Sequence, residues 1–362
     1  MRTGCNTGAL IEMRMEKIEH QRILVIGGAG FIGSNLVRAL LKSHPKEIIV
    51  VDNLLSSESK NLPASSEITF IEGSITDDTI LESLRDGLSY VFHLATFHGN
   101  QNSIHDPMAD HENNALTTLK LYERLKSFRG LKKVVYASAG CSVAPKTYGE
   151  ATATSEDAPM SLFMDSPYQI SKMVGELYSN YYFQQHGLPV VKDRFQNVFG
   201  PGEILGAGKW RGTPATVWRN VIPTFIYRGL KGMPLIVENE GRASRDFIYV
   251  EDIVRGLLLC AADGVSGEVY NLASGVETSI LDLALLINRL TENPAPIQLG
   301  PKREWDHSGR RFGSTVKARE TIGFQAVISL DDGLTRTIDW TRRNLDWVEA
   351  CIQKHTVHMD SF

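Results

Sequence analysis

The first two hundred residues alternate between short apolar runs and longer stretches in which apolar residues recur every three or four positions. The apolar runs predict strands near 22–27, 47–52, 68–72, 89–95, 132–138 and 189–195. The amphipathic stretches predict helices near 31–43, 77–86, 107–128 and 168–186. Strands that alternate with helices in this way predict an α/β fold, a Rossmann-type doubly wound parallel sheet covered by helices on both faces.

The pattern changes after Gly200-Pro201-Gly202, where residues 200–215 are rich in glycine and proline and predict a long loop. Helices are predicted near 217–227, 279–291 and 331–345. We therefore expect a Rossmann domain over 21–200 and a smaller C-terminal substrate-binding lobe over 201–350. Strands near 247–250 and 269–272 leave this boundary open, because either can rejoin the first sheet. Residues 1–20 are expected to be a poorly ordered extension, and 351–362 a tail.

Three glycines, Gly27, Gly30 and Gly33, lie at the turn between the first strand and the first helix. In that context, Gly27 allows the tight turn, Gly30 admits a diphosphate close to backbone N–H groups, and Gly33 lets helix and strand pack closely. Asp52 ends the second strand and suits a hydrogen bond to an adenosine ribose 2′-hydroxyl. Because the carboxylate would repel a 2′-phosphate, the sequence predicts NAD rather than NADP.

Composition narrows the class of protein further. The chain is 42% hydrophobic and 22% charged, which is typical of a globular protein with a sizeable core. A net charge of −4 gives no reason to expect nucleic acid or an anionic membrane as a partner. The four cysteines are widely spread and lack metal-ligand or disulfide spacing, and no segment is long enough to cross a membrane. We expect a cytoplasmic protein without a metal site.

Tyr168 and Lys172 are spaced four residues apart at the start of a predicted helix, behind Ser166-Pro167. Residues at this spacing share one helix face, so the phenol and the ammonium point the same way. A nearby ammonium and a positive nicotinamide ring would each favour the phenolate and lower the tyrosine pKa. The phenolate could then take a proton from a substrate hydroxyl while hydride leaves the same carbon for NAD⁺.

Several sequence motifs occur across most of the chain in the order that is typical of one family. In these motifs the chain resembles the extended short-chain dehydrogenases/reductases, and among these the NAD-dependent nucleotide-sugar epimerase/dehydratase family. The matching segments are GGAGFIG (27–33), HLA (93–95), YASAGC (136–141), YQISK (168–172), RFQNVFGPG (194–202), RDFIYVEDI (245–253) and YNLASG (270–275).

The resemblance implies further cofactor residues. Phe31 and Ile32 would cover the NAD diphosphate through their backbone, Ala95 would line the adenosine side, and Asn114 would hold the helix that carries the Tyr168/Lys172 pair. Other positions near NAD would be Asn53, Ser74, Ile75 and Leu94.

A second set of residues is implied for the substrate. Asn197 would contact its sugar or diphosphate, and Asn220 lies in the segment that touches the diphosphate. Arg245 and Arg303 would clamp the phosphates, a task that suits a fixed, always charged fork.

The chain departs from the family pattern after the fifth strand. Ala139 stands where the family usually has Ser or Thr, so the hydroxyl that contacts the reacting group must come from Ser138, Ser142 or water, or be absent. Cys141 stands where dehydratases and decarboxylases of the family carry a carboxylate, and where GDP-mannose 3,5-epimerases carry a cysteine. A small buried hydrophobic role for Cys141 is the alternative.

These observations predict an NAD-dependent epimerase of a nucleotide-diphosphate hexose or uronate, acting at C4 through a transient 4-keto sugar. Decarboxylation, dehydration or 3,5-epimerisation after the same oxidation is the enzymatic alternative. An alternative of another class is a catalytically weak protein that binds NAD and a nucleotide sugar. Ala139 suggests this alternative, because the loss of the usual hydroxyl could accompany a loss of catalysis. A homodimer is expected, because in relatives the helices near 107–128 and 168–186 pair into a four-helix interface.

Overall fold

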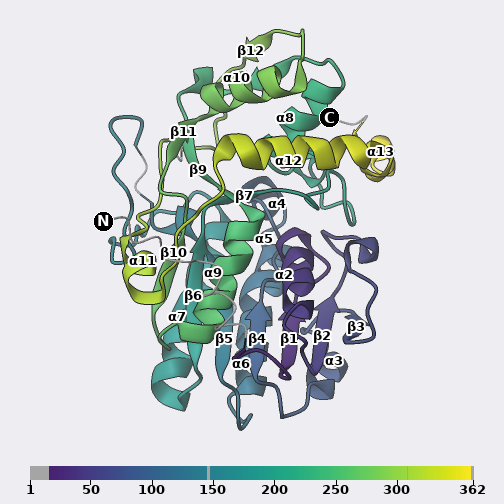
Figure 1. The fold of residues 1–362 in the computed structure, drawn as a ribbon. Helices are drawn as coiled ribbons and strands as arrows, with labels where there is room; N and C mark the ends of the chain where they lie inside the picture. Colours follow the sequence, from purple (N-terminus) through teal and green to yellow (C-terminus); the bar gives the residue numbers. More distant parts are fainter. Residues whose placement is uncertain (1–15, 145–146, 308, 360–362) are drawn as a thin grey trace, which may run out of the picture.

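A seven-stranded parallel sheet forms the larger part of the molecule (Figure 1). The structure, a computed structural model, describes residues 16–144, 147–307 and 309–359. The strand order is β10-β6-β5-β4-β1-β2-β3, and each neighbouring pair is parallel. This confirms the predicted doubly wound fold. The strands are β1 (Arg22–Ile26), β2 (Glu47–Asp52), β3 (Ile68–Glu72), β4 (Tyr90–His93), β5 (Lys133–Ala139), β6 (Val190–Phe195) and β10 (Val269–Leu272).

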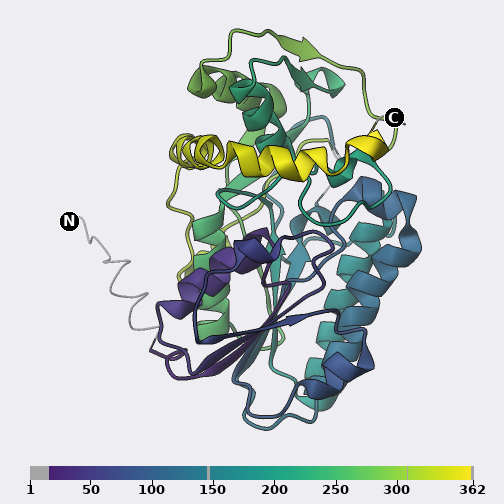
Figure 2. The ribbon, with the colours of Figure 1, turned by 90° about the vertical axis from the view of Figure 1, so that its right-hand side faces the viewer.

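Helices cover both faces of this sheet, as Figures 1 and 2 show. On one face, α2 (Phe31–Leu41) and α9 (Val250–Asp263) pack on strand residues such as Ile23 and Val25. On the other face, α3 (Asp78–Ser83), α6 (Thr117–Leu125) and α7 (Pro167–His186) pack on the alternate residues, including Leu24 and Ile26. Successive strand side chains point to opposite faces, so strands covered on both sides, such as β1 and β4, are apolar along most of their length.

The helix predicted over 107–128 is interrupted. The chain forms α4 (Asn100–His105) and α5 (Pro107–Asp110), then a π turn over His111–Leu116, and only then α6. The wider π turn shifts the faces of the residues within it relative to a continuous α-helix. Asn114 lies in this turn, so its side chain is placed by the turn and not by the regular helical repeat.

The smaller lobe lies beyond the carboxyl ends of the strands, with α12 (Leu330–Arg343) running across it (Figure 1). It contains the sheets β11-β9-β7 and β12-β8. Their strands are β7 (Asn197–Phe199), β8 (Leu235–Val237), β9 (Ser244–Tyr249), β11 (Glu277–Ser279) and β12 (Ile297–Leu299). The remaining helices are α8 (Val221–Leu230), α10 (Ile280–Thr291), α11 (Val316–Ile322), α13 (Leu345–Gln353) and α14 (Thr356–Met359). Short 3₁₀ turns occupy Ser59–Asn61, Gly140–Ser142, Pro214–Thr216 and Asn239–Gly241.

Of the two late strands that were candidates to rejoin the Rossmann sheet, only one does so. β10 pairs with β6 and becomes the seventh strand, whereas β9 pairs with β7 and β11 in the smaller lobe. After residue 200 the chain therefore enters the smaller lobe and later returns to the Rossmann sheet, so no single residue divides the two parts.

Both predicted terminal segments need correction where the structure describes them. Ile18 is fully buried and the Lys17 ammonium lies 2.6 Å from Asp263, so the fold begins before residue 20; residues 1–15 of the predicted extension lie outside the described residues. Residues 351–359 of the predicted tail are mostly helical, and Cys351 and His355 are buried. Among the described residues, no helix combines the length and the apolar character that crossing a membrane requires.

Candidate active site

A cavity of about 700 Å³ opens where the carboxyl ends of the strands face the smaller lobe. Open parallel sheets bind ligands at this end, where the strand order reverses between β1 and β4. Apart from Asn114, every residue predicted for the site lines this cavity: Gly27, Gly30, Phe31, Ile32, Gly33, Asp52, Asn53, Ser74, Ile75, Leu94, Ala95, Ser138, Cys141, Tyr168, Lys172, Asn197, Asn220, Arg245 and Arg303.

The glycine turn is shaped to hold a diphosphate. Gly27 has a φ of +83°, and a Cβ atom there would lie 2.6 Å from the Ala95 backbone nitrogen. A Cβ atom on Gly33 would lie 2.1 Å from the Gly27 carbonyl oxygen, so any side chain would push α2 away from the turn. α2 begins at Phe31 behind Gly30 with no side-chain cap, which leaves its N-terminus directed at the cavity. These features fit the diphosphate of a dinucleotide.

Asp52 is fixed at the tip of β2. Its carboxylate accepts hydrogen bonds from the backbone N–H groups of Ala29 and Leu54, each at 2.9 Å, and from the Ser57 hydroxyl at 2.8 Å. Burial raises the pKa of Asp52, and these hydrogen bonds act in the opposite direction. The bonds hold the carboxylate at the cavity wall, in the position that suits an adenosine ribose.

The structure places Tyr168 and Lys172 together on the first turns of α7. Ser166 caps this helix by accepting a hydrogen bond from the Gln169 backbone N–H. The Lys172 ammonium donates to the Ala137 carbonyl at 2.9 Å and lies 5.9 Å from the centre of the Tyr168 ring. Burial lowers the pKa of Lys172 to about 8, while Asp110 and Cys141 act to raise it.

The Tyr168 pKa differs from the sequence expectation. Burial raises it, and the negative charges that Cys141 and Asp110 can carry raise it further, whereas the Thr96 hydroxyl lowers it through a hydrogen bond. The expectation that the lysine lowers this pKa neglected the desolvation of the phenol, which is the larger effect here. Within the protein alone, Tyr168 therefore holds its proton firmly.

Ser138, expected as a source of the missing hydroxyl, is already engaged. Its hydroxyl donates to the Glu176 carboxylate, which also receives two hydrogen bonds of 2.8 Å from Arg194. Ser142 donates at 3.5 Å to the Gln169 carbonyl and does not line the cavity. Thr96, which directly follows the HLA motif, supplies the hydroxyl that contacts Tyr168, and the sequence analysis missed it.

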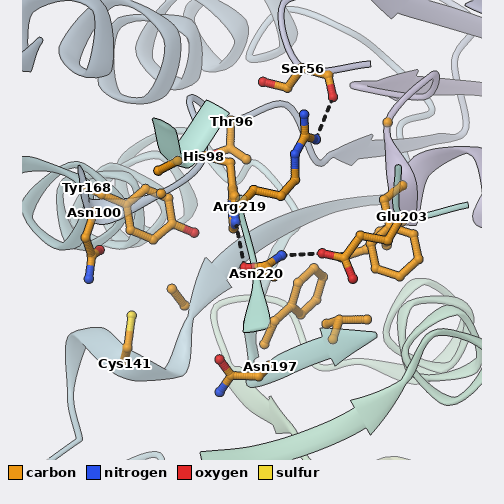
Figure 3. Close-up of a pocket in the computed structure, with 18 of the residues that line it drawn as sticks. Ser56, Thr96, His98, Asn100, Cys141, Tyr168, Asn197, Glu203, Arg219 and Asn220 are labelled. Carbon is orange, nitrogen blue, oxygen red and sulfur yellow. Dashed lines mark hydrogen bonds between the residues drawn. The ribbon is translucent and has the colours of Figure 1, made fainter. Parts of the chain in front are cut away.

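Cys141 lies on the turn after β5, on the same side of the cavity as Tyr168 (Figure 3). Its side chain is half-buried, and it is near enough to Tyr168, Lys172 and Arg245 for its charge to shift the pKa of each. Cys141 therefore faces Tyr168, Lys172 and Arg245 together across one cavity. Among the described residues, no cluster of metal-ligating side chains was found.

A chain of three polar side chains, His98, Asn220 and Glu203, crosses the cavity (Figure 3). Asn220, at the N-cap of α8, lies 3.3 Å from the His98 ring nitrogen and donates to Glu203. Burial lowers the pKa of His98 to about 4, so this imidazole is neutral at pH 7, and burial raises the pKa of Glu203 to about 7. Arg219 bonds the Ser56 and Ala207 carbonyls and joins two loops over the cavity. No role was predicted for His98 or Glu203 from the sequence.

Arginines gather at the smaller lobe. Arg245 is half-buried, donates to the Gly309 carbonyl at 2.6 Å and lies 3.5 Å from Asp306. Burial and the neighbouring Arg311 lower its pKa to about 9. Arg303 forms an ion pair with Glu238. Arg311 is half-buried and also lines the cavity. It was not predicted, because two consecutive arginines are typical of a charged surface. In the structure only Arg310 points outward, where it forms an ion pair with Glu277.

Asn114 is the one predicted cofactor residue that does not line the cavity. Its amide oxygen accepts from the Phe97 N–H at 2.7 Å, and its amide nitrogen donates to Ser171 on α7 at 3.2 Å. Asn114 is therefore placed to hold α7 and does not reach a cofactor itself, because the π turn directs it to the helix.

Comparison with known proteins gives consistent matches. The sequence model of the NAD-dependent epimerase/dehydratase family matches residues 23–273. A putative UDP-glucose 4-epimerase of Methanocaldococcus jannaschii is 30% identical over 329 residues, which cover 89% of this chain and 99% of that protein. A UDP-N-acetyl-α-D-glucosaminuronate decarboxylase of Bacillus cytotoxicus is 31% identical over 334 residues, covering 89% of this chain and 98% of that protein.

Among solved structures, the Bordetella bronchiseptica enzyme WbmF in complex with NAD⁺ and UDP superposes with a TM-score of 0.87. Its sequence is 58% identical, and the match covers 96% of this chain and 100% of that chain.

Proposed function

The chain belongs to the NAD-dependent epimerase/dehydratase family and is an enzyme that uses NAD, and from this premise we propose that it epimerises a nucleotide-diphosphate sugar. The proposed reaction inverts C4 of an NDP-hexose or NDP-uronate through a transient 4-keto sugar. One observation supports the proposal most strongly. Tyr168, Lys172 and the glycine turn line the same cavity as the three arginines Arg245, Arg303 and Arg311.

NAD supplies the hydride acceptor and donor when it is bound. As the phenolate, Tyr168 would take the proton of the C4 hydroxyl and become a phenol, and it would return this proton after the 4-keto sugar has rotated in the site. Lys172, whose pKa is about 8, carries a positive charge at pH 7 and stabilises the phenolate as it forms. Because burial raises the Tyr168 pKa, the phenolate depends on this ammonium and on the positive nicotinamide ring.

The substrate diphosphate is assigned to Arg245, Arg303 and Arg311, with Asn197 and Asn220 as amide donors. Arginine forks bind phosphate oxygens in pairs, and the Arg245 side chain is only 12% exposed, so water would screen such bonds less than at an open surface. The UDP in WbmF and the activities named for the relatives support a nucleotide-sugar substrate.

Incubation of the protein with UDP-, GDP-, CDP- and dTDP-sugars tests the proposal. We expect one sugar nucleotide to convert to a product of equal mass, with NMR locating the inversion at C4 and no net consumption of NAD. A product lighter by water or carbon dioxide would contradict epimerisation and favour dehydration or decarboxylation.

Cys141 favours one alternative, 3,5-epimerisation, because its thiol faces the same cavity as Tyr168 and is placed to exchange a proton beside a ketone. If that route operates, Cys141→Ala will lower turnover by ~10²-fold or more, and wild-type reactions in D₂O will place deuterium at C3 or C5. For the proposed 4-epimerase, we expect Cys141→Ala to change turnover less than about tenfold with no deuterium on carbon. Proton NMR of the product measures both. Nucleotide-sugar binding without any product would support the catalytically weak protein instead.

We also propose a homodimer formed by α4, α5 and α7. These helices pack side by side, and their outer surface exposes apolar side chains at Ile104, Met108, Ile170, Leu177 and Tyr181. Apolar side chains gathered on one exposed face are typical of a protein–protein interface. Sedimentation velocity that finds one chain per particle at micromolar concentration would contradict the dimer.

A further inference from the structure

A buried carboxylate lies behind the catalytic helix, outside the cavity. Asp110 ends α5, is only 1% exposed, and accepts a 2.7 Å hydrogen bond from the Asn114 amide nitrogen. The Ser171 hydroxyl of α7 also bonds this carboxylate. An ionised side chain taken so completely out of water is costly unless an opposite charge and hydrogen bonds compensate it.

The opposite charge is supplied by Lys172. Its ammonium is also buried, with 4% of the residue exposed, and its hydrogen bond goes to the neutral Ala137 carbonyl. Burial raises the pKa of Asp110, and Ser171, Asn114, Lys172 and His111 act to lower it. The other titratable side chains that face the Lys172 ammonium are Cys141, Tyr168, Tyr136, whose ring centre lies 5.5 Å away, and the buried His93. Asp110 is therefore the carboxylate that balances the catalytic lysine.

A chain of polar contacts also joins Asp110 to the phenol. The Asn114 amide oxygen accepts a 3.0 Å hydrogen bond from Thr96, whose hydroxyl contacts Tyr168. Asp110 and Asn114 are four residues apart, on either side of the start of the π turn, and this turn brings both side chains beneath α7. The Asp110 charge thus acts on both members of the pair: it favours the charged form of Lys172 and raises the pKa of Tyr168, while Asn114 and Thr96 join Asp110 to the phenol by hydrogen bonds.

We propose that Asp110 is a positioning residue of the active site, which holds Lys172 in its charged form and orients Asn114 beneath the catalytic helix. This inference rests on the proposed role of Lys172 in the epimerase. It predicts that neutralising Asp110 lowers the pKa of Lys172, because the ammonium loses its counter-charge.

Asp110→Asn is the direct test, because asparagine has nearly the same shape and can still accept the hydrogen bond from Asn114. We expect the Lys172 titration midpoint, near pH 8 in the wild type, to fall by about one pH unit. NMR of lysine labelled at Cε measures the midpoint, and Lys172→Met identifies the signal. The alkaline loss of activity should move to lower pH by the same amount.

Asp106→Asn is the matched control, because it removes the same charge from an exposed position four residues earlier. It should leave the Lys172 midpoint unchanged, and thermal unfolding will show whether both variants are folded. A folded Asp110→Asn protein with an unchanged Lys172 midpoint would overturn the inference. A shifted midpoint in a protein that epimerises no sugar would uphold the inference and count against the proposed function alone. If Asp110→Asn does not fold, Asp110→Glu, which keeps the charge, must fold and retain the wild-type midpoint.

Discussion

Tyr168→Phe should lower kcat of the proposed epimerase by about 10³-fold, because it removes the group that moves the C4 hydroxyl proton. The phenol lies in the cavity beside Lys172 and His98, with ring centres of Tyr168 and His98 6.1 Å apart. Phenylalanine fills the same volume, so binding of NAD and of the nucleotide sugar should change less than threefold. Single-turnover kinetics with the active sugar nucleotide, together with the NAD content of the purified protein, measure both quantities.

Tyr181→Phe is the control for this experiment, since Tyr181 lies on the same helix but is 51% exposed on its outer surface. It should leave kcat within twofold of the wild type. Full turnover by Tyr168→Phe would remove the central element of the proposed mechanism. Loss of activity together with loss of NAD would instead show that the phenol mainly holds the cofactor.

Arg194→Met is expected to reduce the free energy of unfolding by about 3–5 kcal/mol, because it leaves Glu176 buried without its cation. The two side chains are each 6% exposed and share two hydrogen bonds of 2.8 Å, and Arg194 also donates to the Glu156 carbonyl. Breaking one side of such a pair strands a charge in a medium that solvates it poorly. Urea unfolding followed by circular dichroism measures the loss.

The double variant Arg194→Met/Glu176→Met separates a stranded charge from lost packing. Removing both charges should recover about 2 kcal/mol or more of the single-variant loss. Lys126→Met, which breaks the exposed pair with Glu123, should cost less than about 1 kcal/mol. An equal loss in the single and double variants would mean that the ion pair contributes only through its packing.

The local sequence pattern was enough to predict the sheet and the cofactor end of the site. Short apolar runs marked six of the sheet's strands without tertiary information, although β6 also buries Lys192, Asp193 and Arg194. The glycine turn and Asp52 were equally predictable, because close backbone approach excludes a Cβ atom and a strand tip fixes where a carboxylate lies. The spacing of Tyr168 and Lys172 placed both on one face of α7.

Only the tertiary structure decided which neighbours these residues meet. Ser138 is bound to Glu176, Thr96 reaches Tyr168, and Arg311 turns into the cavity while Arg310 turns out. Each contact joins segments far apart in the chain, and a periodic pattern carries no information about such pairs. The raised Tyr168 pKa has the same origin, since desolvation depends on everything packed around the phenol and not on the lysine four residues away.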